Sequence, residues 1–386
     1  MGSFDDLLGE ALASVRARGR WRELRPAALA PGGRIVRNGC ELVDFSSNDY
    51  LGLSGHPLLA ERAGEWARSH GAGAGASRLV TGTNPAHVAL EGRIAAFKGT
   101  EAALLFASGW QANATVIPAL LAAAPGMAVF ADRLVHASMH AGMTGQRQHR
   151  FHHNDLAHLA ELLEQHGRAA PARLILVESV YSMDGDRADI PALAALAREH
   201  DALLMVDEAH ATGVLGPSGA GLCAGIAGVG VIMGTFSKAL GSFGAYVAGS
   251  AALRDWLVNA ASGFIFSTAP PPAVLGAIDA GLDLVPGMEA ERAHLAALAD
   301  RLRQGLAERG IDAANSSTQI VPAIIGSEAD ALALSERLAA HGMLAAAIRP
   351  PTVPPGTSRL RIALRASHSA ADVDSLLAAL DGMAAP

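Results

Sequence analysis

The sequence LLMVDEAH at residues 203–210 places Asp207 directly after an apolar run, and GTFSKALG at 234–241 places Lys238 after a second one. Each pattern is typical of a buried strand that ends in a polar turn. Further apolar strands alternate with helical segments between residues 85 and 250. This alternation predicts an α/β fold whose mostly parallel sheet is covered by helices, with the polar turns gathered at the carboxyl ends of the strands.

The pattern divides the chain into three predicted segments: 1–48, 49–285 and 286–386. The first is an N-terminal arm with an amphipathic helix and a hairpin turned by Asn38-Gly39. The second is the large domain, and the third is a smaller C-terminal α/β domain. The strands expected in the two domains are 102–106, 127–130, 174–178, 203–207, 229–233, 244–248, 319–325, 343–348 and 359–364, with helices from Gln111, Pro191 and Ala329 and a last helix opened by Ser369 and Asp372.

Composition excludes several classes of protein. The net charge of -7 arises from acidic and basic residues spread along the chain, which argues against a nucleic-acid or anionic-membrane surface. Cys40 and Cys223 stand far apart and indicate neither a disulfide framework nor a zinc site, and we expect no metal. Without a signal-peptide core or a membrane-length apolar stretch, we expect a cytoplasmic protein that acts on small molecules.

Lys238 and Asp207 together predict a cofactor. A lysine among hydroxyls and glycines can hold an aldehyde as a Schiff base, and a carboxylate at the end of a buried strand can pair with a pyridinium nitrogen. These are the two groups that pyridoxal phosphate (PLP) needs most. Taken singly, Lys238 reads as a surface lysine and Asp207 as a helix cap, but their joint occurrence favours the cofactor.

Other strand ends supply groups suited to the same ligand. Gly109 and Trp110 lie in the turn before the helix expected from Gln111, whose free N–H groups could bind a phosphate, although an ordinary βα turn has the same pattern. His136 could stack on a flat ring, and His210 could donate to a phenolic oxygen. The hydroxyl candidates for cofactor contact are Ser182, Thr235 and Thr268.

Two further charged motifs remain open between structural and functional roles. Arg349 precedes a proline run that holds the backbone extended, which suits a guanidinium that clamps a substrate carboxylate, but an exposed loop arginine fits equally well. Glu178 ends a predicted strand and reads either as a contributor to the site or as a satisfied structural carboxylate.

The chain resembles the α-oxoamine synthases from about residue 20 to its end. The matching motifs are SNDYLGL (47–53), GASRLVTGT (75–83), FASGW (106–110), DRLVHAS (132–138), YSMDGD (181–186), VDEAH (206–210), GTFSKALG (234–241) and RPPTVPPGTSRLRI (349–362). The resemblance implies the fold type I architecture of PLP-dependent transferases and a homodimer with its active site at the subunit interface.

The resemblance also implies roles for individual residues. Lys238 would carry PLP, Asp207 would pair with its pyridinium nitrogen and His136 would stack on its ring. Arg349 would bind the carboxylate of the amino acid. The remaining implied contacts are Gly109, Trp110, Ser182, His210, Thr235 and Thr268 for the cofactor, and Arg22, Asn48, His136 and Thr352 for the substrates.

Within the family, the length and the RPPTVP run are most similar to the member that condenses L-alanine with pimeloyl-CoA, or a pimeloyl-carrier protein, in biotin biosynthesis. A sister reaction that uses glycine, with succinyl-CoA or acetyl-CoA, is the main alternative. Two further alternatives are an amino-transfer reaction on the same fold and a binding module without catalytic activity. The ratio of CoA release with alanine to that with glycine separates the first two.

Overall fold

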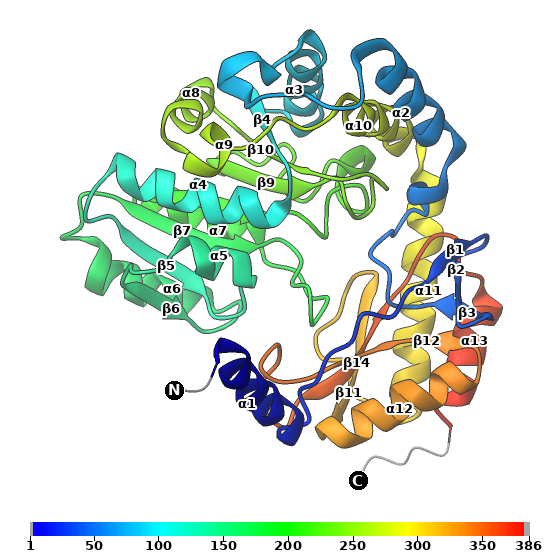
Figure 1. Ribbon diagram of the computed structural model, residues 1–386. Coiled ribbons are helices and arrows are strands. Elements are labelled where there is room, and N and C mark those ends of the chain that lie inside the picture. The colour runs from blue at the N-terminus through cyan, green and yellow to red at the C-terminus, as the bar shows by residue number, and fades with distance from the viewer. Residues whose placement is uncertain (1–2, 382–386) are drawn as a thin grey trace.

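The computed structural model describes residues 3–381. Its largest sheet has seven strands, and helices flank this sheet (Figure 1). Strand β10 is antiparallel to β4 and β9, and the other pairings are parallel. The mostly parallel sheet is thus confirmed. In spatial order its strands are β4 (Ala102–Phe106), β10 (Ala245–Gly249), β9 (Val231–Thr235), β8 (Leu203–Asp207), β7 (Arg173–Glu178), β5 (Ala128–Asp132) and β6 (Gln148–Phe151).

Alternate side chains of each central strand enter two separate cores. Ile175 and Val177 of β7 join one core, while Leu174 and Leu176 join the other. A strand buried on both faces must be apolar throughout, which is why these strands read as continuous hydrophobic runs. The first core is covered by α3 (Pro85–Lys98), α6 (Leu156–Leu162), α7 (Ile190–Glu199) and α10 (Pro272–Leu284), and the second by α4 (Gly109–Ala123), α5 (Ala137–Gly142), α8 (Ala251–Ala260) and α9 (Ser262–Ile265).

The C-terminal unit is a second α/β unit with its own sheet and helices. Its antiparallel sheet has the order β11-β14-β13, and its last helix begins at the predicted capping box of Ser369 and Asp372. The elements are η5 (Val285–Gly287), α11 (Glu289–Glu308), β11 (Ile320–Gly326), α12 (Glu328–Ala340), β12 (Met343–Leu344), β13 (Ala346–Ile348), β14 (Ser358–Ala363) and α13 (Ala370–Ala379). The remaining helices are α2 (Pro57–His70), η1 (Leu53–Gly55), η2 (Arg78–Gly82), η3 (Leu163–Gly167) and η4 (Pro217–Gly219).

The N-terminal segment has two parts with different surroundings. The hairpin of β2 (Arg34–Arg37) and β3 (Cys40–Asp44) turns at Asn38 and Gly39 as predicted, and β1 (Ala28–Ala30) extends it. Strand β12 pairs parallel to β3, so the hairpin lies in one sheet with the C-terminal unit.

Helix α1 (Phe4–Ala17), by contrast, buries none of its residues and lies at the periphery (Figure 1). Within residues 3–381, none of the helices is long and apolar enough to cross a membrane. The boundaries proposed at 48/49 and 285/286 remain a prediction, and residues 1–2 and 382–386 lie outside the described part of the chain.

Candidate functional site

A cavity of about 250 Å³ opens at the carboxyl edge of the central sheet. Its walls come from the turns after β4, β5, β7, β8 and β9, because the ends of parallel strands meet at one edge. Lining residues that the sequence predicted are Gly109, Trp110, His136, Asp207, His210, Thr235 and Lys238. Other lining residues include Ser108, Asn113, Ser138, Glu178 and Ser237.

Asp207 ends β8 as a fixed, buried carboxylate. It is 4% exposed, its Oδ2 accepts a hydrogen bond from Asn113 Nδ2 at 2.8 Å, and its Oδ1 accepts from the backbone N–H of Ala209 at 2.8 Å. Donors on both oxygens favour the ionised form. The site therefore contains a negative charge that is held in one orientation.

Lys238 belongs to a chain of short polar contacts. Its Nζ lies 2.8 Å from Nε2 of His210, whose Nδ1 lies 2.6 Å from the hydroxyl of Tyr50. Burial, followed by the charges of Lys238 and Arg361, lowers the pKa of His210 well below its ordinary value, so this imidazole is neutral. Its two nitrogens can thus act as one donor and one acceptor between the phenol and the amine.

The amine of Lys238 is also prepared to act as a base or nucleophile. Burial lowers its pKa to about 8, against the opposing charge of Asp207. The chain contains only one other lysine, Lys98, whose Nζ pairs with Glu208 Oε2 at 2.5 Å in the protein interior. Lys238 is therefore the lysine whose amine faces a cavity.

Arg361 completes the contact chain, and it was missed as a site residue. Its guanidinium donates to Oδ1 of Asn48 at 3.0 Å and to the carbonyl of Ser182 at 2.6 Å. The hydroxyl of Tyr50 donates to the same Asn48 oxygen at 3.0 Å. Arg361 lies on the fully buried strand β14, and a charged residue within such a strand was the available signal.

His136 stands at the mouth of the cavity beside Trp110. Its Nδ1 lies 2.7 Å from the hydroxyl of Ser138, and Ser138 in turn accepts from Asn113 at 3.0 Å. The rings of His136 and Trp110 meet edge to face, with centroids 6.1 Å apart. Asn113 therefore orients both Asp207 and, through Ser138, His136. Neither Asn113 nor Ser138 was predicted, since their role depends on contacts between separate turns.

The opposite wall offers donors for an anion. Helix α4 begins at Gly109, two residues earlier than predicted, and Ser108 caps it by accepting from Gln111 N. A Cβ at position 109 would meet its nearest atom, on Met233, at 3.8 Å, so the protein itself leaves room there. Thr235 and Ser237 face each other with hydroxyls 2.6 Å apart. Free N–H groups and hydroxyls of this kind suit a phosphate.

Glu178 is not the satisfied carboxylate that one interpretation of the sequence expected. It lies beside Asp207 in the β7–β8 register, is 2% exposed, and its Oε1 has no hydrogen-bond partner among the described residues. Burial and the charge of Asp207 raise the pKa of Glu178 well above its ordinary value. A neutral carboxylic acid next to a fixed carboxylate can donate a hydrogen bond into the cavity.

Several predicted residues do not line this cavity. Arg349 was predicted to bind the carboxylate of the amino acid, which stays a prediction; its guanidinium donates to the carbonyl of Gly19 at 2.7 Å. Arg361, in contrast, is connected to Lys238 through Tyr50 and His210. A separate cavity of about 290 Å³ is lined by Arg20, Arg22, Arg349 and Thr352, among others.

Ser182 contributes its carbonyl to Arg361 and does not line the Lys238 cavity. Thr268 is exposed, forms a bridge with Ser77 and lines a third, small cavity with Arg78. Thr268 therefore does not line the Lys238 cavity of its own chain, and its contact with the cofactor stays a prediction.

Comparison with known proteins adds independent findings. The family model for aminotransferases of class I and II matches residues 41–380. A relative from Bordetella pertussis, provisionally named 8-amino-7-oxononanoate synthase, is 62% identical and covers 98% of this chain and 97% of its own. The 8-amino-7-oxononanoate synthase of Gluconacetobacter diazotrophicus is 57% identical and covers 100% and 98%, respectively.

Solved structures show the same architecture. Serine palmitoyltransferase of Sphingomonas wittichii superposes with a TM-score of 0.89 at 30% identity, covering 98% of this chain and 96% of its own. A second structure, described as SPT with PLP, has a TM-score of 0.87 at 27% identity and covers 97% and 96%. The predicted fold type I architecture is confirmed by these neighbours.

Proposed function

The chain belongs to the aminotransferase class I and II family and, within it, to the 8-amino-7-oxononanoate synthases, and from this premise we propose its reaction. The enzyme joins Cα of L-alanine to the thioester carbonyl of pimeloyl-CoA or a pimeloyl-carrier protein. CoA or the carrier thiol leaves, and the alanine carboxyl group leaves as carbon dioxide. The product is 8-amino-7-oxononanoate, an intermediate of biotin biosynthesis.

One observation carries the proposal: the amine of Lys238 shares a cavity with the fixed carboxylate of Asp207. This cavity fits PLP, because it combines a free amine, a carboxylate, a helix N-terminus and an unpartnered buried oxygen on Glu178. When bound, PLP supplies an electron sink that stabilises negative charge on Cα of the amino acid.

We assign the cofactor contacts by the chemistry of each wall. Lys238 would hold the aldehyde carbon and Asp207 the pyridinium nitrogen, with His136 against the ring. His210 suits the phenolic oxygen. The phosphate suits the α4 N-terminus at Gly109 and Trp110 together with Thr235, while Ser182 remains a candidate through its side chain.

The amino acid requires a partner for its carboxylate, and Arg361 supports this role better than Arg349. Arg361 is 7% exposed, and its guanidinium lies 3.5 Å from the hydroxyl of Tyr50, which contacts His210 of the cavity wall. Nζ of Lys238 would take the proton from Cα of the amino acid. A pKa near 8 lets that amine exchange protons near neutral pH.

The acyl donor brings anionic groups that the second cavity could receive. Arg20, Arg22 and Arg349 give its walls a concentrated positive charge, and Thr352 adds a hydroxyl. Phosphates and carboxylates pair with guanidinium groups through parallel hydrogen bonds. We therefore assign Arg22, Arg349 and Thr352 to the thioester substrate.

Family membership supports a homodimer in the cytoplasm. Helix α1 exposes Phe4, Leu7 and Leu8, an apolar surface that a second subunit could cover. A partner could also bring Thr268 to the cofactor, although Thr268 stands apart from the cavity of its own chain. Sedimentation of the purified protein would test the dimer.

The function is tested by supplying PLP-loaded enzyme with alanine or glycine and with pimeloyl-, succinyl- or acetyl-CoA. We expect thiol release and carbon dioxide in equal amounts, fastest with alanine and pimeloyl-CoA. Preference for glycine with a short acyl-CoA would establish the sister activity. Keto-acid formation without thiol release would establish amino transfer. The Lys238→Ala variant is the control for background hydrolysis.

A further inference from the structure

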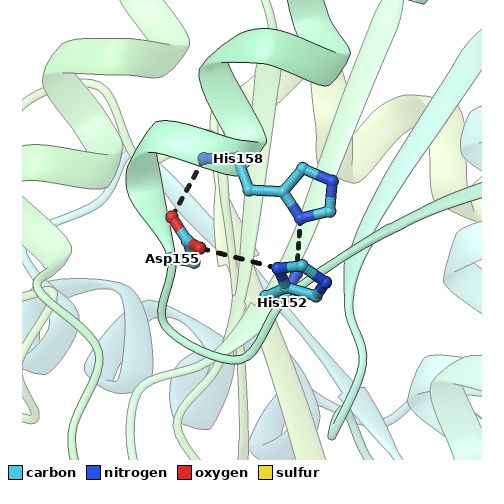
Figure 2. A group of neighbouring side chains, drawn as sticks. All are labelled: His152, Asp155 and His158. Atoms are coloured by element: carbon cyan, nitrogen blue, oxygen red, sulfur yellow. Dashed lines mark hydrogen bonds and ion pairs between the residues drawn. The ribbon is translucent and has the colours of Figure 1, made fainter.

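The loop between β6 and α6 is held in shape by its own side chains (Figure 2). The backbone N–H of His152 donates to Nδ1 of His158 at 3.0 Å, and Asp155 caps α6 by accepting from the backbone N–H of His158 at 2.9 Å. Donor atoms of these three residues lie within 4.8 Å of one another, as in a metal site. Because Nδ1 of His158 already accepts a main-chain hydrogen bond, we assign the group to loop structure.

This loop presents His153 toward two buried carboxylates. Nδ1 of His153 donates to Oδ1 and Oδ2 of Asp132 at 3.0 and 3.1 Å, and Nε2 donates to Oδ2 of Asp186 at 2.8 Å. Asp132 is fully buried and Asp186 is 4% exposed. An ionised carboxylate only accepts hydrogen bonds, so both ring nitrogens must carry hydrogen. With both carboxylates ionised, these contacts describe an imidazolium between two aspartates.

Asn154 reinforces the same bridge. Its backbone N–H donates to Oδ2 of Asp132 at 2.8 Å, and its Nδ2 donates to Oδ2 of Asp186 at 2.7 Å. Its φ of 54° lies in the left-handed region, which asparagine tolerates better than most residues. Two consecutive residues thus connect the same pair of carboxylates, and a chance surface contact would not be duplicated in this way.

The two aspartates belong to the turns that follow two neighbouring strands of the central sheet, β5 and β7. Asp132 ends β5 and accepts from Leu134 N at 2.8 Å, within the turn that leads to His136. Asp186 closes the turn that contains Ser182, because the backbone N–H of Tyr181 donates to its carbonyl at 3.1 Å. The carbonyl of Ser182 in turn holds Arg361.

We propose that His153 is a positioning residue whose imidazolium, bound between Asp132 and Asp186, fixes the turn of His136 relative to the turn that supports Arg361. It touches neither cofactor nor substrate. The proposal rests on the proposed function to the extent that His136 and Arg361 contact PLP and alanine, but the bridge itself is a property of the protein alone.

The charged state of the bridge predicts a dependence on pH. Burial alone would lower the pKa of His153, but hydrogen bonds to and the charges of Asp132 and Asp186 outweigh it and raise the pKa to about 10. Tyr181 packs edge-on against the ring at 4.3 Å, and burial raises its pKa well above 10, so it stays neutral. The folded pKa exceeds the ordinary 6.5, so the stabilisation is complete below pH 6.5 and is lost as pH rises through 10.

The first test uses protein without cofactor. Thermal midpoints of wild type and His153→Gln are compared between pH 6.5 and 10.5, with His152→Gln as the matched control, since that change keeps the backbone N–H of the loop. We expect the thermal midpoints of wild type and of His152→Gln to fall together as the pH rises toward 10. The difference between the wild-type midpoint and that of His153→Gln should therefore become smaller. A difference in thermal midpoint between wild type and His153→Gln that does not change with pH would overturn the proposal.

A second measurement does not depend on any variant folding well. Nitrogen NMR of wild-type protein with labelled histidine rings, at pH 8, should show one imidazole with hydrogen on both nitrogens, assigned by its absence in His153→Gln or, failing that, by its contact with Tyr181. A neutral His153 at pH 8 would overturn the proposal.

The third test uses PLP-loaded enzyme. For His153→Gln we expect the PLP dissociation constant to rise and kcat to fall, each roughly tenfold to a hundredfold, with altered circular dichroism of the bound cofactor and an unchanged KM for the thioester. If the PLP dissociation constant, kcat and circular dichroism of His153→Gln all equal those of wild type, the positioning role is overturned. If wild type itself binds no PLP, the proposed function fails, whereas the first two tests still decide the bridge.

Discussion

The carboxyl edge of the central sheet and the 349–356 loop of the C-terminal unit differ in how firmly they hold their charged side chains. Asp207 at the sheet edge is 4% exposed and receives a hydrogen bond on each carboxylate oxygen. Arg349 on the loop is half-buried, and its guanidinium makes one hydrogen bond within residues 3–381, to the carbonyl of Gly19. This difference motivates our proposal that the sheet edge performs the chemistry and that the loop receives a substrate.

The largest expected effect is at the sheet edge. Replacing Lys238 by Ala should lower CoA release by at least about 10⁴-fold, because one amine both holds the cofactor and moves the proton. Borohydride treatment of PLP-loaded wild type should attach the cofactor to position 238. Lys98, the other lysine, is the internal control, and label found there would contradict the assignment.

The two arginines give the most direct test of the comparison. Arg361→Ala should raise KM for L-alanine roughly a hundredfold, since it removes a charged hydrogen-bond partner, while Arg349→Ala should leave that KM unchanged and raise KM for pimeloyl-CoA roughly tenfold. Steady-state kinetics with each substrate varied in turn measure both values. Arg361→Lys retains the positive charge and is the control for a folding defect in Arg361→Ala. The reverse pattern would return Arg349 to the alanine carboxylate.

The lowered pKa of Lys238 should appear in the rate of PLP uptake. Only the unprotonated amine attacks the aldehyde, so the rate constant for uptake by cofactor-free protein should rise about tenfold per pH unit up to pH 8 and then level off. Stopped-flow absorbance between pH 6 and 9.5 measures it. A rate that keeps rising beyond pH 9 would indicate an ordinary, exposed lysine.

The smallest effect is expected at Gly109. A Cβ there meets the protein only at 3.8 Å, so Gly109→Ala should leave the thermal midpoint of the cofactor-free protein nearly unchanged. It should weaken PLP binding by several-fold to tenfold if a phosphate approaches this backbone. Equilibrium dialysis of PLP and a thermal melt give the two values. Equal PLP affinity in both proteins would place the phosphate elsewhere.

Sequence patterns were enough to predict the position of a residue where that position follows from the strand before it. Asp207 and Lys238 stand after apolar runs that could only be buried strands, and parallel strands bring such ends together. Strand β6, in contrast, was not predicted, because this edge strand carries Gln148, His149 and Arg150 and lacks an apolar run. The hairpin was recognised from Asn38-Gly39, but its pairing with β12 joins residues some 300 positions apart along the chain.

By itself, the order of residues along this chain determined the fold class and the chemistry of the sheet edge, because strand periodicity and turn residues act over a few positions. Tertiary structure alone decided that Arg361 contacts Tyr50 in the contact chain that reaches Lys238, that Asn113 orients Asp207, and that His153 bridges Asp132 and Asp186. The physical reason is that side-chain hydrogen bonds between distant segments depend on distances of a few ångströms, which local patterns do not encode.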